Sequence, residues 1–267
     1  MSIKVQNLDF AYDRKRQVLK DISFAIDDGK MVCLIGPNGV GKSTLFKTIL
    51  GLIHCSNGKI YLDGEDTTNM SAAQIARKVA YIPQSSPVTF NYSVFEMVLM
   101  GTTAGMSMFA VPEKKERQTA EEAMEKLGIS NLKNRGFSYI SGGERQLALI
   151  ARALCQQSKV LIMDEPTANL DYGNSTRVMQ HIKELSLGGY TIIQATHQPD
   201  QAFMYADEVL AMKDGSIIAQ GEPREIITKE LIEELYGVQV EIESLYGDSL
   251  RVCVPMKPGD VKKERSL

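Results

Sequence analysis

Nine residues constrain this chain more than any other stretch of it: GPNGVGKST, at positions 36–44. They follow MVCLI, a continuous apolar run typical of a buried parallel strand, and precede STLFKTILGL, which has the pattern of a helix. Glycines in this context let backbone N–H groups curl around phosphate oxygens, while a lysine adds charge and a hydroxyl suits magnesium. The sequence therefore predicts a nucleotide-phosphate site built from Gly36, Pro37, Asn38, Gly39, Val40, Gly41, Lys42, Ser43 and Thr44. Within it, Lys42 is expected at the outer phosphates and Ser43 on Mg²⁺.

A second stretch, KVLIMDEPTANLD at 159–171, brings two carboxylates to the end of an apolar strand. Ligands bind at the carboxyl ends of strands in open α/β sheets. Asp164 is therefore expected to hold magnesium, and Glu165 to orient or deprotonate an attacking water. An apolar strand ending in Asp-Glu is common by itself, but beside a phosphate loop it indicates a nucleotide hydrolase.

Residues 138–154, SYISGGERQLALIARAL, open a helix with a start that suits an anion. Ser141 and Glu144 have the spacing of a capping box. Gly142 and Gly143 form helices poorly, so their place in the first turn indicates that something approaches the backbone closely. A well-capped helix without a ligand is the plainer alternative. The pattern raises the question of why one chain has two helix N-termini suited to binding phosphate so far apart in sequence.

Strand and helix patterns alternate along most of the chain. Strand patterns occur in MSIKVQNLDF, VLKDISFAID, GKIYLDG, VAYIPQ, YTIIQAT and EVLAM, and the Asp-Gly pair before SIIAQG predicts a hairpin. From about 89 to 157 strand patterns stop, and a helix is expected with Pro112 in its first turn and Gly128 at its end. This order predicts an α/β fold with a mostly parallel sheet and an inserted helical region. A small strand pair is expected within LYGVQVEIESLYGDSLRVCVP, near the C-terminus.

Five motifs follow one another in order: GPNGVGKST, ISGGERQ, VLIMDEP, ANLD and ATHQ. Together they resemble the nucleotide-binding subunit of ATP-binding-cassette (ABC) transporters, over residues 3 to about 225. The resemblance implies a P-loop NTPase core with an antiparallel β subdomain and a helical subdomain at about 89–157. It places the nucleotide-binding domain at 1–225 and a short C-terminal extension at 226–267.

The resemblance also implies an ATPase that uses ATP and Mg²⁺ and works as a head-to-tail homodimer. In that family the ISGGERQ stretch closes over the ATP held by the other subunit. Ser141 and Gly143 would then contact the γ-phosphate in trans, with Gly142 between them, and this would account for the second helix start. The sequence departs from the commonest family pattern at three positions, Ile140, Glu144 and Asn169.

Further single residues acquire roles by the same resemblance. Tyr12 falls where the family stacks an aromatic ring on adenine, with a core aromatic as the alternative. Gln84 matches the glutamine that touches magnesium and water and links to the membrane subunit. His197 matches the histidine that senses the γ-phosphate, and Asp171 lies in the loop that couples the two sites. The implied catalytic set is Lys42, Gln84, Glu165 and His197, and the implied metal ligands are Ser43, Gln84 and Asp164.

A methionine-rich stretch after Gln84, SVFEMVLMGTTAGMSMFAVPEKK, holds Met97, Met100, Met106 and Met108. Because methionine adapts to irregular partners, helical core packing and a groove for a helix of a membrane subunit are both open. This stretch, with HQPDQAFMYAD and KDGSIIAQGEP, resembles the importers of iron chelates, haem, cobalamin and, in some members, molybdate. It implies a ferric siderophore as the first substrate candidate and integral membrane permease subunits as partners. A periplasmic or lipoprotein substrate-binding protein would be an indirect partner.

Composition and charge narrow the classes of partner and the cellular locations that remain open. The net charge of −3 and the pI near 5.8 argue against a nucleic-acid partner, which usually selects a basic surface. No stretch of 18 residues is continuously apolar, so no membrane-spanning segment is expected. The resemblance implies a peripheral subunit on the cytoplasmic face of the cell membrane. The main alternative is a soluble ABC ATPase that acts in iron–sulfur cofactor assembly without a permease.

Overall fold

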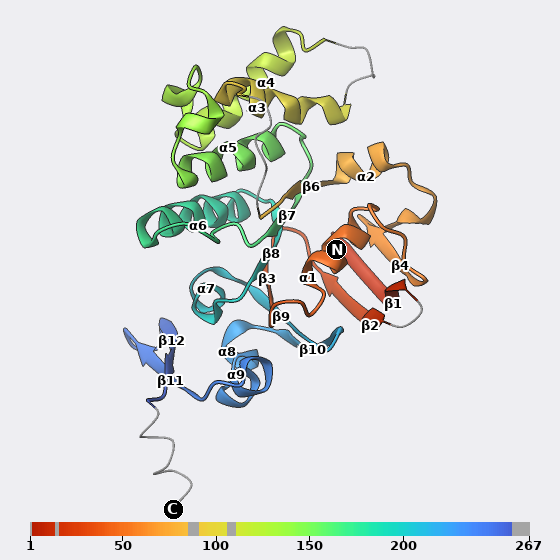
Figure 1. Ribbon diagram of the computed structural model, residues 1–267, viewed down its shortest axis with the longest axis vertical. Helices are drawn as coiled ribbons and strands as arrows, with labels where there is room; N and C mark the ends of the chain where they lie inside the picture. The colour runs from red at the N-terminus through yellow and green to blue at the C-terminus, as the bar shows by residue number, and fades with distance from the viewer. Residues whose placement is uncertain (1, 14–15, 85–90, 106–110, 258–267) are drawn as a thin grey trace, which may run out of the picture.

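The computed structural model describes residues 2–13, 16–84, 91–105 and 111–257 (Figure 1). Within these ranges a six-stranded sheet forms the centre, in the order β10 (Ser216–Gly221), β9 (Glu208–Lys213), β3 (Met31–Ile35), β8 (Thr191–Thr196), β7 (Val160–Asp164) and β6 (Val79–Ile82). Neighbouring strands are parallel except for β10, which returns antiparallel to β9 after a turn at Asp214 and Gly215. The predicted mostly parallel sheet and its terminal hairpin are confirmed.

The inner strands β3, β7 and β8 of this sheet are buried at every position because both faces are covered. Alternate residues of β3 point to opposite sides: Val32 and Leu34 join the core under α1 (Lys42–Ile49). On the other face, Met31 packs in the core of α6 (Tyr172–Leu187), and Cys33 packs with α7 (Pro199–Tyr205) and α9 (Lys229–Tyr236). The carboxyl ends of β3, β7 and β8 meet at one edge between these layers.

A second, antiparallel sheet lies beside α1, at the right of Figure 1. Its order is β2 (Arg16–Ile26), β1 (Ile3–Asp13), β4 (Asn57–Leu62) and β5 (Glu65–Asp66). Buried residues alternate along β1, since only one face of this sheet meets the core. Its β2 strand lies next to the β9–β10 turn, where the N–H of Lys20 donates to the Gly215 carbonyl oxygen at 2.9 Å.

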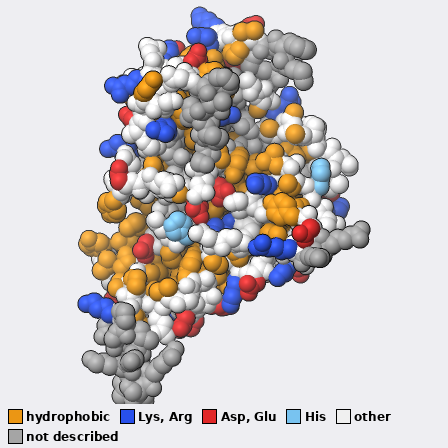
Figure 2. Space-filling model, viewed as in Figure 1, with side chains coloured by type: hydrophobic (Ala, Val, Ile, Leu, Met, Phe, Trp, Pro, Cys, Tyr) orange, Lys and Arg blue, Asp and Glu red, His pale blue; other side chains and the backbone are white. Residues whose placement is uncertain are grey.

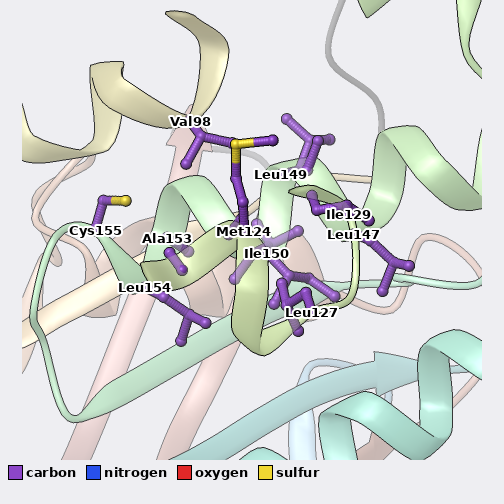
Figure 3. Close-up of a cluster of buried hydrophobic side chains, with 14 of the residues drawn as sticks. Val98, Met124, Leu127, Ile129, Leu147, Leu149, Ile150, Ala153, Leu154 and Cys155 are labelled. Atoms are coloured by element: carbon purple, nitrogen blue, oxygen red, sulfur yellow. The ribbon is translucent and has the colours of Figure 1, made fainter. Parts of the chain in front are cut away.

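The helical region stands above α6 in Figure 1 and contains α3 (Val94–Leu99), α4 (Lys114–Lys126), α5 (Gly142–Leu154) and a 3₁₀ segment at Met100–Gly105. Figure 3 shows Met124 of α4 between Val98 of α3 and the apolar side chains of α5. Met97 is 7% exposed in this core and Met100 packs against it, so core packing is the alternative that holds for both. Met106 and Met108 lie outside the described residues.

The start of α4 differs from the prediction. Pro112 was expected in the first turn, but the helix begins at Lys114 with Glu113 as its N-cap residue. Glu113 and Glu116 form a capping box, in which the Glu113 N–H donates to the Glu116 carboxylate at 3.0 Å. This bond pairs one backbone donor at the helix start with a side chain of the first turn, and the helix starts after the proline rather than at it.

Several short elements had no prediction: α2 (Ala72–Lys78), α8 (Pro223–Ile226), α9, and 3₁₀ turns at Thr67–Asn69, Ser130–Leu132 and Phe137–Tyr139. The expected C-terminal strand pair is present as β11 (Val240–Leu245) and β12 (Leu250–Pro255), which pair antiparallel. The Cys253 N–H of β12 donates to the Asp200 carboxylate of α7 at 2.8 Å. None of the helices in the described ranges combines the length and the apolar character that crossing a bilayer requires.

Candidate active site

The loop between β3 and α1 has backbone conformations that favour glycine. Gly36 has φ +150°, and a Cβ there would lie 2.3 Å from the Met212 carbonyl oxygen of β9. Gly41 has φ +119°, and a Cβ there would lie 3.1 Å from the Val18 carbonyl oxygen. Both ends of the loop are therefore packed tightly against neighbouring strands. Gly39, with φ +78°, would have nothing within 4 Å of its Cβ and faces open space.

Lys42, the first residue of α1, folds back over this loop. Its Nζ donates to the carbonyl oxygens of Gly36 at 2.7 Å and Pro37 at 3.1 Å. Burial lowers the pKa of Lys42, and the nearby carboxylates of Glu165 and Asp164 oppose that shift. The two carboxylates thus favour the charged ammonium beside the loop.

Tyr236, the last residue of α9, holds the same loop from the C-terminal part of the chain. The Gly36 N–H donates to the Tyr236 hydroxyl oxygen at 3.1 Å, across 200 positions of sequence. Burial raises the pKa of Tyr236 to about 12, so the hydroxyl is neutral at physiological pH. No pattern in the sequence indicates this contact, because it depends on how α9 packs against the sheet.

Tyr236→Phe is expected to lower the free energy of unfolding by about 1–3 kcal/mol, because the Gly36 N–H loses its acceptor while the ring is kept. The matched control is Tyr246→Phe, at a residue that is 83% exposed. The control is expected to change that free energy by less than about 0.5 kcal/mol. Urea unfolding followed by circular dichroism measures both, and equal stability of the two variants would contradict the contact.

The end of β7 places two carboxylates beside the loop. Asp164 is 7% exposed, and the Tyr81 hydroxyl of β6 donates to its Oδ2 at 3.4 Å. Burial, together with the charge of Asp164, raises the pKa of Tyr81 to about 12. Glu165 follows in the left-handed region, with φ +49°, and its carbonyl oxygen accepts the Ala168 N–H at 3.0 Å. The strand therefore ends at Asp164, and Glu165 begins a tight turn.

Two predicted residues from separate loops, Gln84 and His197, meet at the Glu165 carboxylate. Gln84 Nε2 donates to Glu165 Oε2 at 3.2 Å, and His197 Nδ1 lies 3.5 Å from Glu165 Oε1. The Glu165 side chain is 14% exposed, whereas that of His197 is 45% exposed. A mostly buried carboxylate thus lies between an amide and an imidazole that still faces solvent, an arrangement suited to holding a water molecule and taking a proton from it.

An open pocket of about 590 Å³ joins these groups. Figure 2 shows acidic, basic and histidine side chains close together near the centre of this face. The predicted residues that line the pocket are Tyr12, Asn38, Gly39, Gly41, Lys42, Ser43, Thr44, Gln84, Asp164 and Glu165. Gly36, Pro37, Val40 and His197 are not among its lining residues, although Gly36 and Pro37 contact Lys42 and His197 lies beside Glu165.

Tyr12 lies at the other end of the pocket and is 61% exposed, so it is not a core aromatic. Its hydroxyl is 3.4 Å from Thr44 Oγ1, and its ring meets Phe10 edge to face with centroids 4.8 Å apart. One ring face is therefore free to stack on a flat ligand. Sequence analysis missed three further lining residues at this end, Asp13, Arg16 and Val18.

The second helix start lies outside this pocket. Ser141 and Glu144 form the predicted capping box: Ser141 N–H donates to Glu144 Oε2 at 2.7 Å, and Glu144 N–H donates to Ser141 Oγ at 3.3 Å. The backbone N–H of Ser141 lowers the pKa of Glu144. A Cβ at Gly143 would lie 2.7 Å from Asn174 Oδ1, so packing against α6 is one reason for this glycine, while Gly142 is exposed.

Asp171 is the N-cap residue of α6 and also lies outside the pocket. Its carboxylate accepts the Asn174 N–H at 2.8 Å and the Asn174 side-chain amide at 2.7 Å. The Asn174 backbone N–H lowers the pKa of Asp171. Asn174 therefore connects the ISGGERQ helix start to the ANLD loop, and within one chain both are separate from the pocket that holds Lys42 and Glu165.

Residues 19–168 match the ABC transporter family. The chain is 38% identical over 242 residues to an uncharacterized ABC transporter ATP-binding protein of Haemophilus influenzae, covering 91% of this chain and 92% of that protein. It is 34% identical to the ferric enterobactin transport ATP-binding protein FepC of Escherichia coli, covering 85% of this chain and 84% of that protein.

The fold also resembles a chain from a metal-chelate type ABC transporter, solved in an inward-facing conformation. The TM-score is 0.85 at 31% sequence identity, and the match covers 97% of this chain and 98% of that one. Because similarity in sequence and in fold extends over nearly the whole chain, this protein belongs to the ATP-binding proteins of the ABC transporter family and is an ATPase.

Proposed function

We propose that this chain is the ATP-hydrolysing subunit of an importer that brings a metal chelate across the cytoplasmic membrane, with a ferric siderophore as the first candidate. The Glu165 carboxylate between Gln84 and His197, beside the Lys42 loop, carries the catalytic part of this proposal. The similarity to ferric enterobactin and metal-chelate proteins supports the substrate class. Haem, cobalamin and molybdate are the further candidates.

In this proposal ATP occupies the open pocket from Tyr12 to Glu165. The Tyr12 ring stacks on adenine, the loop N–H groups surround the phosphates, and Lys42 neutralises the outer ones. Ser43, Asp164 and Gln84 all line the pocket with hard oxygen donors, a set that suits Mg²⁺. When bound, Mg²⁺ would supply charge to the phosphate oxygens. Glu165 takes a proton from the attacking water, and His197 hydrogen-bonds the γ-phosphate.

We further propose that Ser141, Gly142, Gly143 and Asp171 act in a homodimer, where they complete the site of the other subunit. Their separation from the pocket of their own chain supports this role. So does the surface beside them, since Tyr139 is 79% exposed and Tyr172 is 87% exposed. Large exposed aromatic side chains of this kind are typical of surfaces that a protein partner covers.

The division proposed here is a nucleotide-binding domain at 1–225, with helices inserted at about 89–157, and an extension at 226–267. The helical region would contact integral membrane permease subunits on the cytoplasmic face of the membrane. A periplasmic or lipoprotein substrate-binding protein would act with the permease. The alternative is a soluble ABC ATPase in iron–sulfur cofactor assembly, which has the same active site but no permease.

Photo-cross-linking in native membranes distinguishes these two functions. A photo-reactive residue at Val111, which is 78% exposed in the helical region, is expected to capture a membrane protein with several spans. The same probe at Leu187, also 78% exposed but at the end of α6, is the matched control and is expected not to. Capture of a soluble protein at Val111, or none while the ATPase is active, would support the cofactor-assembly alternative.

A further inference from the structure

Gln201, in the first half of α7, is a buried amide whose oxygen and nitrogen are both hydrogen-bonded. Gln201 as a whole is 7% exposed. Its Oε1 accepts the Thr196 hydroxyl at 3.0 Å. Its Nε2 donates to Thr167 Oγ1 at 3.0 Å and to Gln198 Oε1 at 2.9 Å. One side chain thus joins three residues that come from two different loops.

These partners stand directly beside the groups proposed to act on ATP. Thr167 lies two residues after Glu165, in the loop that leaves β7. Thr196 is the last residue of β8 and directly precedes His197. The backbone N–H of Gln198, the residue after His197, donates to Thr196 Oγ1 at 3.1 Å. The loop after β7 and the loop after β8 are therefore linked beneath the surface through Gln201, and at the surface through the 3.5 Å approach of Glu165 and His197.

The position of Gln201 is itself fixed from two sides. Its neighbour Ala202 is fully buried in the core formed with Cys33 and Ile35 of β3. Its other neighbour, Asp200, accepts the Cys253 N–H of β12 at 2.8 Å. Since Thr167 and Thr196 are also more than nine-tenths buried, the linkage exchanges little with water, and a lost partner would leave a buried polar group unpaired.

We propose that Gln201 is a positioning residue for ATP hydrolysis, which holds the Glu165 loop and the His197 loop at the separation that the reaction needs. It is not among the residues that line the pocket, and in this proposal it acts through these two residues. The inference rests on the roles given to Glu165 and His197 in the proposed function. Catalysis of this kind depends on geometry, since a misplacement of about 1 Å can reduce a rate about 100-fold.

Gln201→Met keeps the length of the side chain but removes its hydrogen bonds. It is expected to lower kcat about 10- to 100-fold while KM for ATP changes less than about twofold, because the Lys42 loop is untouched. Gln201→Glu can still accept a hydrogen bond from the Thr196 hydroxyl, and from the Thr167 hydroxyl if that group turns to donate, but it loses the donation to Gln198 Oε1, so its kcat is expected to fall between those of the natural chain and Gln201→Met. Met204→Ala, at a residue 48% exposed on the same helix, is the control and should leave both constants unchanged.

Thr167→Val removes the hydroxyl that accepts from Gln201 Nε2, and so breaks the linkage at the Glu165 loop. This variant provides a second test if Gln201→Met folds poorly. It is expected to lower kcat in the same direction, again with little change in KM. Full activity in Thr167→Val and in Gln201→Met would overturn the inference.

A double-mutant cycle separates positioning from a general loss of stability. In a His197→Ala background, Gln201→Met is expected to lower kcat by a smaller factor than in the natural chain, because one of the two residues it positions is already gone and only the Glu165 loop is left to misplace. Equal losses in both backgrounds would mean that Gln201 acts independently of His197 and would contradict the inference. Full activity of His197→Ala would instead contradict the role of His197 in the proposed function, a result that can be told apart from full activity in Gln201→Met alone.

Discussion

Glu165→Gln is expected to hydrolyse ATP about 100- to 10,000-fold more slowly than the natural chain while it still binds ATP. The amide has the shape of the carboxylate but does not take a proton from water. Gln84 and His197 lie 3.2 and 3.5 Å from the two carboxylate oxygens, so the replaced side chain has the same neighbours. If hydrolysis separates the homodimer, this variant also accumulates as an ATP-bound dimer. Single-turnover hydrolysis and size-exclusion chromatography with ATP measure the two effects.

The chain offers a matched control for this experiment. Glu184 also lies beside a histidine, with His181 Nδ1 at 3.2 Å from its Oε2, but on the exposed surface of α6. Glu184→Gln therefore removes a similar carboxylate–histidine pair and is expected to keep kcat within about twofold. A Glu165→Gln protein that stays monomeric and turns over ATP at the natural rate would rule out Glu165 as the base.

Lys42→Ala is expected to weaken ATP binding by about 2–4 kcal/mol, or roughly 30- to 700-fold in Kd. The substitution removes the ammonium that the outer phosphates would meet. It also removes the donor that satisfies the Gly36 and Pro37 carbonyl oxygens, at 2.7 and 3.1 Å, so the loop loses part of its internal support. Equilibrium titration with a fluorescent ATP analogue measures this change directly.

The control for this second experiment is Lys47→Ala. Lys47 lies in the last turn of the same helix and is exposed. Because it is outside the pocket, its removal is expected to change the Kd for ATP less than about twofold. Circular dichroism of both variants checks that α1 remains folded. An unchanged ATP affinity in folded Lys42→Ala would contradict the role of Lys42 at the phosphates.

Elements with strong local signals were predicted well. The strands β3, β7 and β8 are buried at every position, because helices cover both faces of the central sheet, and their apolar residues gave a clear strand signal. The helices α2, α8 and α9 were missed because each has at most eight residues, too few for a clear period. A signal for α2 was present all the same: Ser71 and Gln74 form a capping box, with the Ser71 N–H donating to Gln74 Oε1 at 2.8 Å.

The active site divides in a similar way. Lys42 and Glu165 belong to local motifs, in which a few adjacent residues carry the chemistry, and their positions could be read directly. Tyr81, Tyr236 and Gln201 could not, because each acts through a contact with a distant segment and stands in no motif of its own. The sequence signal that could have indicated these residues is a polar side chain near the end of a helix or strand whose other residues are largely apolar.

The sequence by itself determined the chemistry of this protein: a phosphate loop, two carboxylates after a buried strand, and a capped glycine-rich helix start. These follow from local spacing, because backbone conformation and side-chain type within a few residues decide whether a loop can surround a phosphate. Only the tertiary structure decided that Glu165 lies between Gln84 and His197, that Tyr236 holds Gly36, and that Gln201 joins the two loops. Such contacts depend on how whole layers pack against one another, and the spacing of residues along the chain does not determine how close two distant segments come.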